Sequence, residues 1–170
     1  MKIEEVDSVL IGDTQVVRIR TDSGISGIGA SACFAYPEAV GSIIEAFRGY
    51  LIGQDPFRIE HHWQHLYRMG PFRGSVLSGA VSAVDIALWD IKGKHYGAPV
   101  WELMGGRCRD KIRLHLLMGS GRTPDDAARN AGAAAQEGFT AVKFDPLPAG
   151  YQDMSLERLI RSAADNVAAA

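Results

Sequence analysis

The sequence has few cysteines, and this shortage excludes one class of protein. Its 170 residues include only two, Cys33 and Cys108, which lie far apart in the chain. A small secreted domain held together by disulfides would carry more. We therefore expect both thiols to be reduced and to serve mostly in packing.

The sequence also lacks an excess of charge and a long apolar run. Eighteen basic and 20 acidic residues give a formal net charge of -2, and they are scattered along the chain. A nucleic-acid-binding protein would show a basic patch, so a small molecule is the favoured partner. No run reaches the roughly 18 apolar residues of a membrane span, and Met1–Glu5 contains no apolar signal region. These absences predict a cytoplasmic protein with no membrane partner.

What is present, 46% hydrophobic and 22% charged residues, is the composition of a soluble globular domain. Residues 4–11 and 14–20 are rich in Val and Ile and flank Gly12-Asp13, which is typical of a β-hairpin. A third strand is expected after the turn at residues 22–24, and it should end near residue 32. The start of the chain therefore predicts a small antiparallel sheet, which needs helices to cover one face.

Three helices are expected next. Pro37 opens one amphipathic stretch, and Asp55-Pro56 caps and starts another. The segment from Ser75 to about His95 is apolar on nearly every side, which predicts a helix in the core. Residues 1–111 therefore form one expected α+β domain.

After residue 111 the pattern alternates between strands and helices, which is typical of parallel strands. Strands are expected over Ile112–Met118 and Thr140–Asp145, and each is followed by a helical pattern. Thr123-Pro124 caps the first of these helices, and an apolar stripe between residues 156 and 167 marks the second. A (β/α)8 barrel needs about 250 residues and eight such units. Residues 112–170 therefore predict the first two βα units of a barrel, and the chain resembles the front part of a larger enzyme.

Five groups of residues are candidates for chemistry, and each also has a structural interpretation. His61 and His65 have the spacing of a zinc helix, but His62 stands where a metalloprotease has its glutamate, so an ordinary helix face is favoured. The glycines at positions 24, 27 and 29 are out of order for a dinucleotide loop, so turn and sheet roles are favoured.

Two further groups are the loop Gly119–Arg122 and the pair Asp85 and Asp90. The loop precedes a helix whose amide groups could hold an anion, although a plain connection is favoured. The two aspartates interrupt the apolar helix, and caps or ion pairs with Lys92, Lys94 or an arginine would explain them.

The sharpest candidate is the pair Lys143 and Asp145. Two residues apart on a strand, they share a face, and Pro146 ends the strand directly after them. The carboxyl ends of barrel strands carry catalytic residues, and a lysine held there can serve as a proton-abstracting base. A structural ion pair is the alternative, and position alone favours neither.

Four segments together resemble the mandelate racemase-like members of the enolase superfamily, closest to their acid-sugar dehydratase branch. They are TDSGISGIG at 21–29, LIGQDPFRIEHHWQHLYR at 51–68, AVSAVDIALWDIKGKHYGAPVWELMGG at 80–106 and GFTAVKFDP at 138–146. The resemblance implies an α+β capping domain followed by a (β/α) TIM-type barrel. It also implies an enzyme in which Mg2+ holds the substrate carboxylate while a base removes the adjacent proton and a sugar acid is dehydrated.

The resemblance assigns roles to individual residues. Lys143 matches the first lysine of the family's Lys-x-Lys motif, an auxiliary electrostatic group, whereas Asp145 replaces the second lysine, often the base. The Gly12-Asp13 connection is short for the family's lid loop, which leaves the loop near Pro71 to face the substrate, with Arg73 as a carboxylate contact. The three acidic Mg2+ ligands and a late histidine are expected beyond Ala170, so no metal ligand is expected in this chain.

The resemblance leaves three functions open. The first is a Mg2+-dependent lyase acting on a sugar acid, homo-oligomeric at full length and inactive as the present chain alone. A racemase, epimerase or cycloisomerase of the same superfamily shares the proton-abstraction step. A non-catalytic capping or assembly module is the third, although two open barrel strands would then expose their edges and apolar faces.

Overall fold

A three-stranded antiparallel sheet forms the base of the first part of the chain. In the computed structural model, which describes residues 1–33, 35–119 and 121–170, strands β1 (Ile3–Ile11), β2 (Thr14–Thr21) and β3 (Ser26–Ser31) pair in that order. Gly12, with a φ of 62°, turns the chain between β1 and β2. The predicted hairpin and third strand are therefore confirmed.

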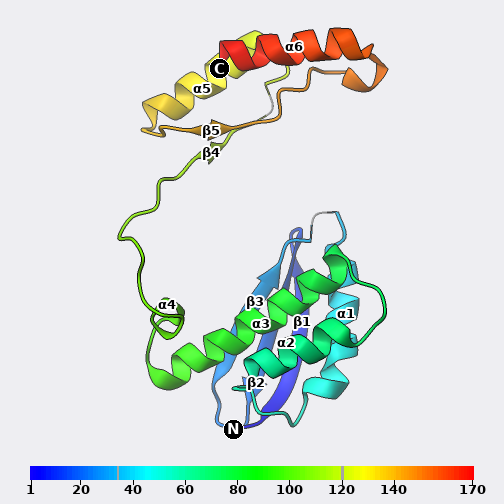
Figure 1. The fold of residues 1–170 in the computed structure, drawn as a ribbon, viewed down its shortest axis with the longest axis vertical. Helices are drawn as coiled ribbons and strands as arrows, with labels where there is room; N and C mark the ends of the chain where they lie inside the picture. The colour runs from blue at the N-terminus through cyan, green and yellow to red at the C-terminus, as the bar shows by residue number, and fades with distance from the viewer. Residues whose placement is uncertain (34, 120) are drawn as a thin grey trace. The chain divides into compact units, whose positions relative to one another are not determined.

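Three helices cover one face of this sheet (Figure 1). They are α1 (Pro37–Leu51), α2 (Ile59–Arg68) and α3 (Ser75–Tyr96), and the short α4 (Val100–Leu103) follows. Every second residue of β2 is buried, namely Gln15, Val17, Ile19 and Thr21. Helices α1, α2 and α3 supply most of the remaining core. The opposite sheet face is exposed and mixed, since Arg18 pairs with Asp7 at 2.8 Å beside the exposed apolar side chains of Val9 and Ile28. This arrangement is that of an antiparallel sheet with one covered side.

Helix α3 lies closest to the sheet, as its apolar sequence predicts. A Cβ atom on Gly29 would stand 1.8 Å from the Ala83 carbonyl oxygen, and one on Gly27 would stand 2.0 Å from that of Ala87. Both glycines lie within β3, which confirms their sheet role. They allow the strand to approach the helix backbone more closely than any side chain would permit.

Helix α2 begins later than the sequence indicates. Asp55-Pro56 was expected to cap and start it, but the helix begins at Ile59. The Asp55 carboxylate instead accepts a hydrogen bond from the Phe57 amide at 3.0 Å, and the Asp55 carbonyl accepts one from Arg58 at 3.2 Å. The aspartate therefore stabilises a turn before the helix, a local bond that competes with helix entry.

The chain divides into two compact units, Met1–Cys108 and Arg109–Ala170. The assignment of residues 1–111 and 112–170 as domains itself stays a prediction. In the second unit, strands β4 (Leu116–Leu117) and β5 (Val142–Lys143) pair in parallel, and helices α5 (Pro124–Gln136) and α6 (Leu156–Ala169) pack against each other (Figure 1). A short 3-10 turn, η1 (Tyr151–Asp153), precedes α6.

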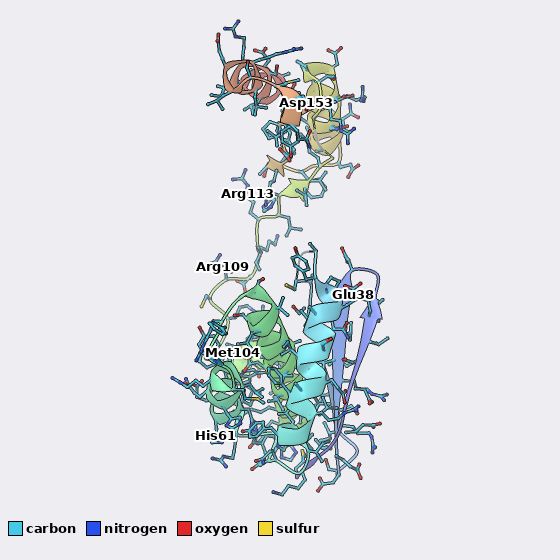
Figure 2. The ribbon with its side chains drawn as sticks, turned by 90° about the vertical axis from the view of Figure 1, so that its right-hand side faces the viewer. Glu38, His61, Met104, Arg109, Arg113 and Asp153 are labelled. Atoms are coloured by element: carbon cyan, nitrogen blue, oxygen red, sulfur yellow. The ribbon has the colours of Figure 1, made fainter. Side chains whose placement is uncertain are left out.

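The parallel pairing is confirmed, but both strands are shorter than predicted. The expected spans Ile112–Met118 and Thr140–Asp145 shrink to two residues each. Among the described residues each strand has a partner on one edge only, so little holds the flanking residues extended. Arg113 (Figure 2) adds a side-chain link before β4. Its guanidinium donates to the Thr140 hydroxyl and carbonyl oxygens at 2.9 and 2.7 Å.

The predicted cap of α5 is also confirmed. The Thr123 hydroxyl oxygen accepts a hydrogen bond from the Asp126 amide at 3.1 Å. Both cysteines are free thiols, as expected, although Cys33 is buried and Cys108 is exposed. No helix in the described part of the chain combines the length and the apolar character needed to cross a membrane.

Candidate active site

Lys143 and Asp145 lie where β5 ends. Lys143 is the last residue of β5, and Asp145 lies two residues beyond it, so the prediction that both belong to the strand is wrong for Asp145. One Asp145 carboxylate oxygen accepts a hydrogen bond from the Leu147 amide at 3.2 Å, across Pro146. Because proline cannot donate to a ladder, the strand ends and the aspartate stabilises the turn that follows.

The two side chains nevertheless share the face of the sheet away from the helices. Lys143 and Asp145 are exposed, whereas Val142 and Phe144 between them are half-buried. The Phe144 ring approaches Gly121 on the side where Ala127 of α5 also lies. Helices cover the outside of a closed βα barrel, so the opposite face, which carries Lys143 and Asp145, corresponds to the barrel interior.

No ion pair joins the Lys143 ammonium group to the Asp145 carboxylate among the ion pairs of the described residues. The structural alternative for this pair depended on such a contact. Both charges stay exposed. A ligand can therefore reach them, although their catalytic role stays a prediction.

A polar pocket of about 320 Å³ lies beside Asp145. It is bounded by residues that follow the carboxyl ends of both strands, Arg122 after β4 and Asp145 with Leu147–Gln152 after β5. The pocket thus combines a guanidinium group, a carboxylate and the Tyr151 side chain, which is suited to a hydroxylated acid. The anion-binding alternative for the loop Gly119–Arg122 includes Ser120, which lies outside the described residues.

Arg73 lies in the first unit, in the segment between α2 and α3. One of its terminal nitrogens donates to the Gly70 and Pro71 carbonyl oxygens at 2.7 and 2.9 Å, and its guanidinium group stands 5.1 Å from the centre of the Tyr67 ring. Next to it, Phe72 is 87% exposed. These contacts hold the loop in shape, and the predicted contact between Arg73 and a substrate carboxylate stays a prediction.

The three histidines of α2 are in different surroundings. His61 (Figure 2) and His65 are exposed, whereas His62 is fully buried. The His62 Nε2 atom donates to the Asp55 carbonyl at 2.8 Å, because a carbonyl can only accept, and its Nδ1 atom then accepts from the Tyr50 hydroxyl at 2.9 Å. Burial lowers the pKa of His62, which keeps the ring neutral. His62 is therefore a satisfied core residue, and the favoured interpretation, an ordinary exposed or interfacial helix face, holds for the exposed His61 and His65 but not for His62.

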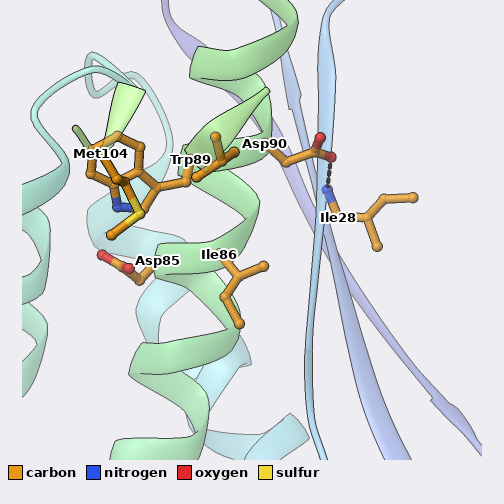
Figure 3. A pocket seen from close by; sticks show the side chains of 7 residues that line it. Ile28, Asp85, Ile86, Trp89, Asp90 and Met104 are labelled. Atoms are coloured by element: carbon orange, nitrogen blue, oxygen red, sulfur yellow. Dashed lines mark hydrogen bonds between the residues drawn. The ribbon is translucent and has the colours of Figure 1, made fainter. Parts of the chain in front are cut away.

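Asp85 and Asp90 differ as well. Asp90 pairs with Lys94 at 2.7 Å and accepts a hydrogen bond from the Ile28 amide at 2.9 Å, so it ties α3 to β3 (Figure 3). Asp85 has no ion pair among the described residues. Burial, with Glu60 nearby, raises the pKa of the Asp85 carboxyl. The predicted ion pair is confirmed for Asp90 alone.

Both aspartates line an apolar pocket of about 620 Å³ in the first unit (Figure 3). Its other lining residues are Ile28, Ile86, Trp89, Val100 and Met104. Met104 is 68% exposed and Ile86 46% exposed. The pocket is an open apolar groove along α3 rather than a closed ligand cavity.

The described residues do not fit a Mg2+ site of their own. No group of three or more histidine, cysteine, aspartate or glutamate side chains within the described ranges is placed to hold a metal ion. Mg2+ is bound by oxygen ligands, which among these side chains are the carboxylates of aspartate and glutamate.

Sequence reasoning missed Tyr151 and Asn166, and it named Arg122 only as the end of a candidate anion-binding loop. Arg122 and Tyr151 line the polar pocket. Asn166 of α6 is 1% exposed, whereas Leu156 and Ile160, which the apolar stripe marked for packing, are 71% and 60% exposed. An amide on an apolar helix was the available signal for Asn166, but the loops that it contacts are distant in sequence.

Comparison with known proteins identifies the family. The family described as mandelate racemase / muconate lactonizing enzyme, N-terminal domain, matches residues 6–105. The chain belongs to this family. The expected fold class, an α+β capping domain followed by the start of a (β/α) barrel, is thereby confirmed.

Solved structures of enolase-superfamily proteins are similar over nearly all of the chain. A candidate dehydratase from Mesorhizobium loti is 34% identical with a TM-score of 0.86, and the alignment covers 99% of this chain and 50% of that one. A superfamily member from Salmonella Typhimurium is 30% identical with a TM-score of 0.87 over the same shares. An enolase from Pantoea ananatis with bound D-gluconate and Mg is 37% identical with a TM-score of 0.74, over 85% of this chain and 36% of that one.

The chain therefore spans about half the length, or less, of these solved relatives. It contains the capping domain and the two βα units that carry Lys143 and Asp145.

Proposed function

We propose that this chain is the N-terminal part of a Mg2+-dependent enzyme that dehydrates a sugar acid. The enzyme removes the proton next to the carboxylate and then eliminates water from the acid. The observation that carries the proposal is the position of Lys143 and Asp145, exposed at the carboxyl end of β5 on the face away from the helices. Catalytic residues of βα barrels occupy such positions. The dehydratase description of one solved relative and the gluconate and Mg bound to another support the substrate class.

Lys143 contributes a positive charge where negative charge develops. Removal of a proton next to a carboxylate places extra charge on the carboxylate oxygens, and an ammonium group held nearby stabilises it. By its resemblance to the first lysine of the family's Lys-x-Lys motif, Lys143 is better suited to this auxiliary role than to that of the base. The Mg2+ ligands and the main base are proposed to lie outside the 170 residues, because the described residues offer no metal cluster.

Asp145 contributes a hydrogen-bond acceptor. One of its carboxylate oxygens accepts from the Leu147 amide, which fixes the orientation of the carboxyl group toward the pocket that it lines. The other oxygen can then accept a hydrogen bond from a hydroxyl group of the substrate. Arg122 lines the same pocket, and its guanidinium group can donate hydrogen bonds to the substrate carboxylate or to another hydroxyl group.

The test uses the natural protein at its full length. Acid sugars are incubated with the purified protein and Mg2+, with and without EDTA, and the 2-keto acid that follows dehydration is measured. Product with Mg2+ and none with EDTA supports the proposal. Solvent deuterium at the carbon next to the carboxylate without keto acid would indicate racemase or epimerase chemistry instead. If no acid sugar gives keto acid or deuterium incorporation, the proposed substrate class is wrong.

A further inference from the structure

Asn166 is a buried amide that contacts the backbone at two distant places. Its side-chain Nδ2 atom donates to the Gly121 carbonyl at 2.7 Å and to the Pro146 carbonyl at 2.8 Å. It is 1% exposed and the buried residue of α6. Both N–H groups of the amide therefore have partners, and both partners lie in loops that follow barrel strands.

These two loops carry the charged residues of the polar pocket. Gly121 directly precedes Arg122, and Pro146 directly follows Asp145. Arg122 and Asp145 line the same pocket of about 320 Å³. A single side chain thus connects the backbone beside one charge to the backbone beside the other.

The loop after β4 is also held closely from its other side. A Cβ atom on Gly121 would stand 2.8 Å from the Ala127 Cβ atom and 3.1 Å from the Phe144 ring. An apolar side chain at position 166 could fill the space of the amide, but it would leave two inward carbonyl groups without their donor. The contribution of Asn166 is consequently its pair of hydrogen bonds rather than its volume.

We infer that Asn166 is a positioning residue, which holds the loops after β4 and β5 together so that Arg122 and Asp145 face one substrate. The identity of the substrate in the pocket rests on the proposed function, whereas the coupling between the two loops is independent of that function. Asn166 does not touch the substrate, so its effect reaches the reaction through the groups it holds in place.

The experiment compares Asn166→Leu and Asn166→Asp in the natural full-length protein. Leucine shares the branched shape of asparagine, although it is larger, and it donates no hydrogen bond, whereas aspartate keeps the size of asparagine and has at most one proton to donate in place of two. Asp165→Asn, an exposed change one residue away on α6, is the matched control. We expect KM for the acid sugar to rise about tenfold to 100-fold in both Asn166 variants, with kcat changed less, because a displaced pocket weakens binding before it affects the Lys143 charge.

Hydrogen exchange gives a readout that needs no activity. Amide exchange should become faster in both peptides that carry the loops, around residues 119–123 and 145–152, and stay unchanged in the sheet of the first unit. Exchange and KM within twofold of the unsubstituted protein in Asn166→Leu would overturn the inference. Faster exchange in only one loop would overturn it as well, since the proposed link is between the two.

The design separates this inference from the proposed function. If the unsubstituted protein acts on no acid sugar, the proposed function fails and the exchange experiment still decides the role of Asn166. If both Asn166 variants fail to fold, Gly121→Ala displaces the same loop by one methyl group without touching α6. Coupled faster exchange in the loop after β5 then supports the link, and an unchanged second loop contradicts it.

Discussion

Lys143 is the residue on which the proposed chemistry depends most directly. We expect Lys143→Ala in the natural full-length protein to lower kcat by about 100-fold to 1000-fold, since one lost charge-stabilising donor in a closed site has an effect of this size. Steady-state kinetics with the acid sugar found by the screen is the measurement. The folded structure should be unaffected, because the Lys143 side chain is exposed.

Lys111→Ala provides the control for Lys143. Lys111 is an exposed lysine of the same unit, so its removal changes the net charge by the same amount. Its kcat should stay within about twofold of the unsubstituted protein, as is usual for an exposed charge outside a site. Equal activity of Lys143→Ala and Lys111→Ala would return Lys143 to a structural role.

His62 makes the stability of the first unit depend on pH. Burial lowers its pKa below the ordinary value of 6.5, so the folded chain binds this proton less readily than the unfolded chain. The stabilisation is complete above pH 6.5 and is lost as the pH falls from there toward the lowered pKa. Over that window the free energy of unfolding should decrease by up to about 1.4 kcal/mol per pH unit from this group. Urea unfolding of the 170-residue chain between pH 7.5 and 5 measures it.

The neighbouring His61 allows the contribution of His62 to be isolated. His61→Gln changes an exposed ring and should leave the pH dependence of stability nearly unchanged. His62→Gln should flatten it, since the buried titrating group is gone. The interpretation fails if both variants show the same slope as the unsubstituted chain.

At the scale of elements, the contact between β3 and α3 is the tightest one in the first unit. We expect Gly29→Ala to lower the free energy of unfolding by about 3 kcal/mol, the upper part of the range for an overpacked core. Its Cβ atom would stand 1.8 Å from the Ala83 carbonyl oxygen, so strand and helix must separate. Denaturant unfolding followed by circular dichroism gives the change.

Gly49→Ala is the opposite case in the same unit. Gly49 lies inside α1, and a Cβ atom there would meet nothing within 4 Å. Alanine should therefore raise the free energy of unfolding by about 0.5 to 1 kcal/mol through backbone entropy. A loss of similar size at both positions would show that the close approach of β3 to α3 is not what decides the result.

The sequence predicted which elements exist better than where they end. The hairpin around Gly12 and the long helix α3 follow from local patterns that tertiary contacts reinforce. Helix α2 begins later and strand β5 ends earlier than predicted, because the side chains of Asp55 and Asp145 accept hydrogen bonds from nearby amides, which propensity does not reveal. The role of Asn166 depends on a contact across 45 residues, which no local pattern contains.

The residues of the candidate site also differ in whether local sequence patterns could reveal them. Lys143 and Asp145 were found from their spacing before a proline and from their resemblance to a family motif. Arg122 and Tyr151 enter the pocket only through the fold, because the two loops meet where parallel strands end. Residues brought together by one element can be predicted from sequence, whereas residues brought together by two cannot.

At the scale of the whole molecule, the two units differ in the size of their apolar cores. The first unit encloses a continuous core of buried residues from the sheet and its helices. In the second unit, several large apolar side chains of β4 and α6 are exposed, including Leu117 at 70%, Leu156 at 71% and Ile160 at 60%. Exposed apolar patches of this kind favour association.

The two units should therefore behave differently when they are compared as proteins. We expect residues 1–108 alone to unfold in one cooperative transition. The 170-residue chain adds the exposed apolar residues of the second unit, so we expect it to bind more of the dye ANS and to self-associate more than residues 1–108. Light scattering after gel filtration and ANS fluorescence measure this. Leu156→Glu with Ile160→Glu, two exposed changes on α6, should reduce this added self-association, because charge on the apolar face opposes association. If the 170-residue chain instead proves monomeric and binds no more dye than residues 1–108, the exposed apolar residues of the second unit do not cause association. The non-catalytic capping or assembly module would then become the better account of the chain.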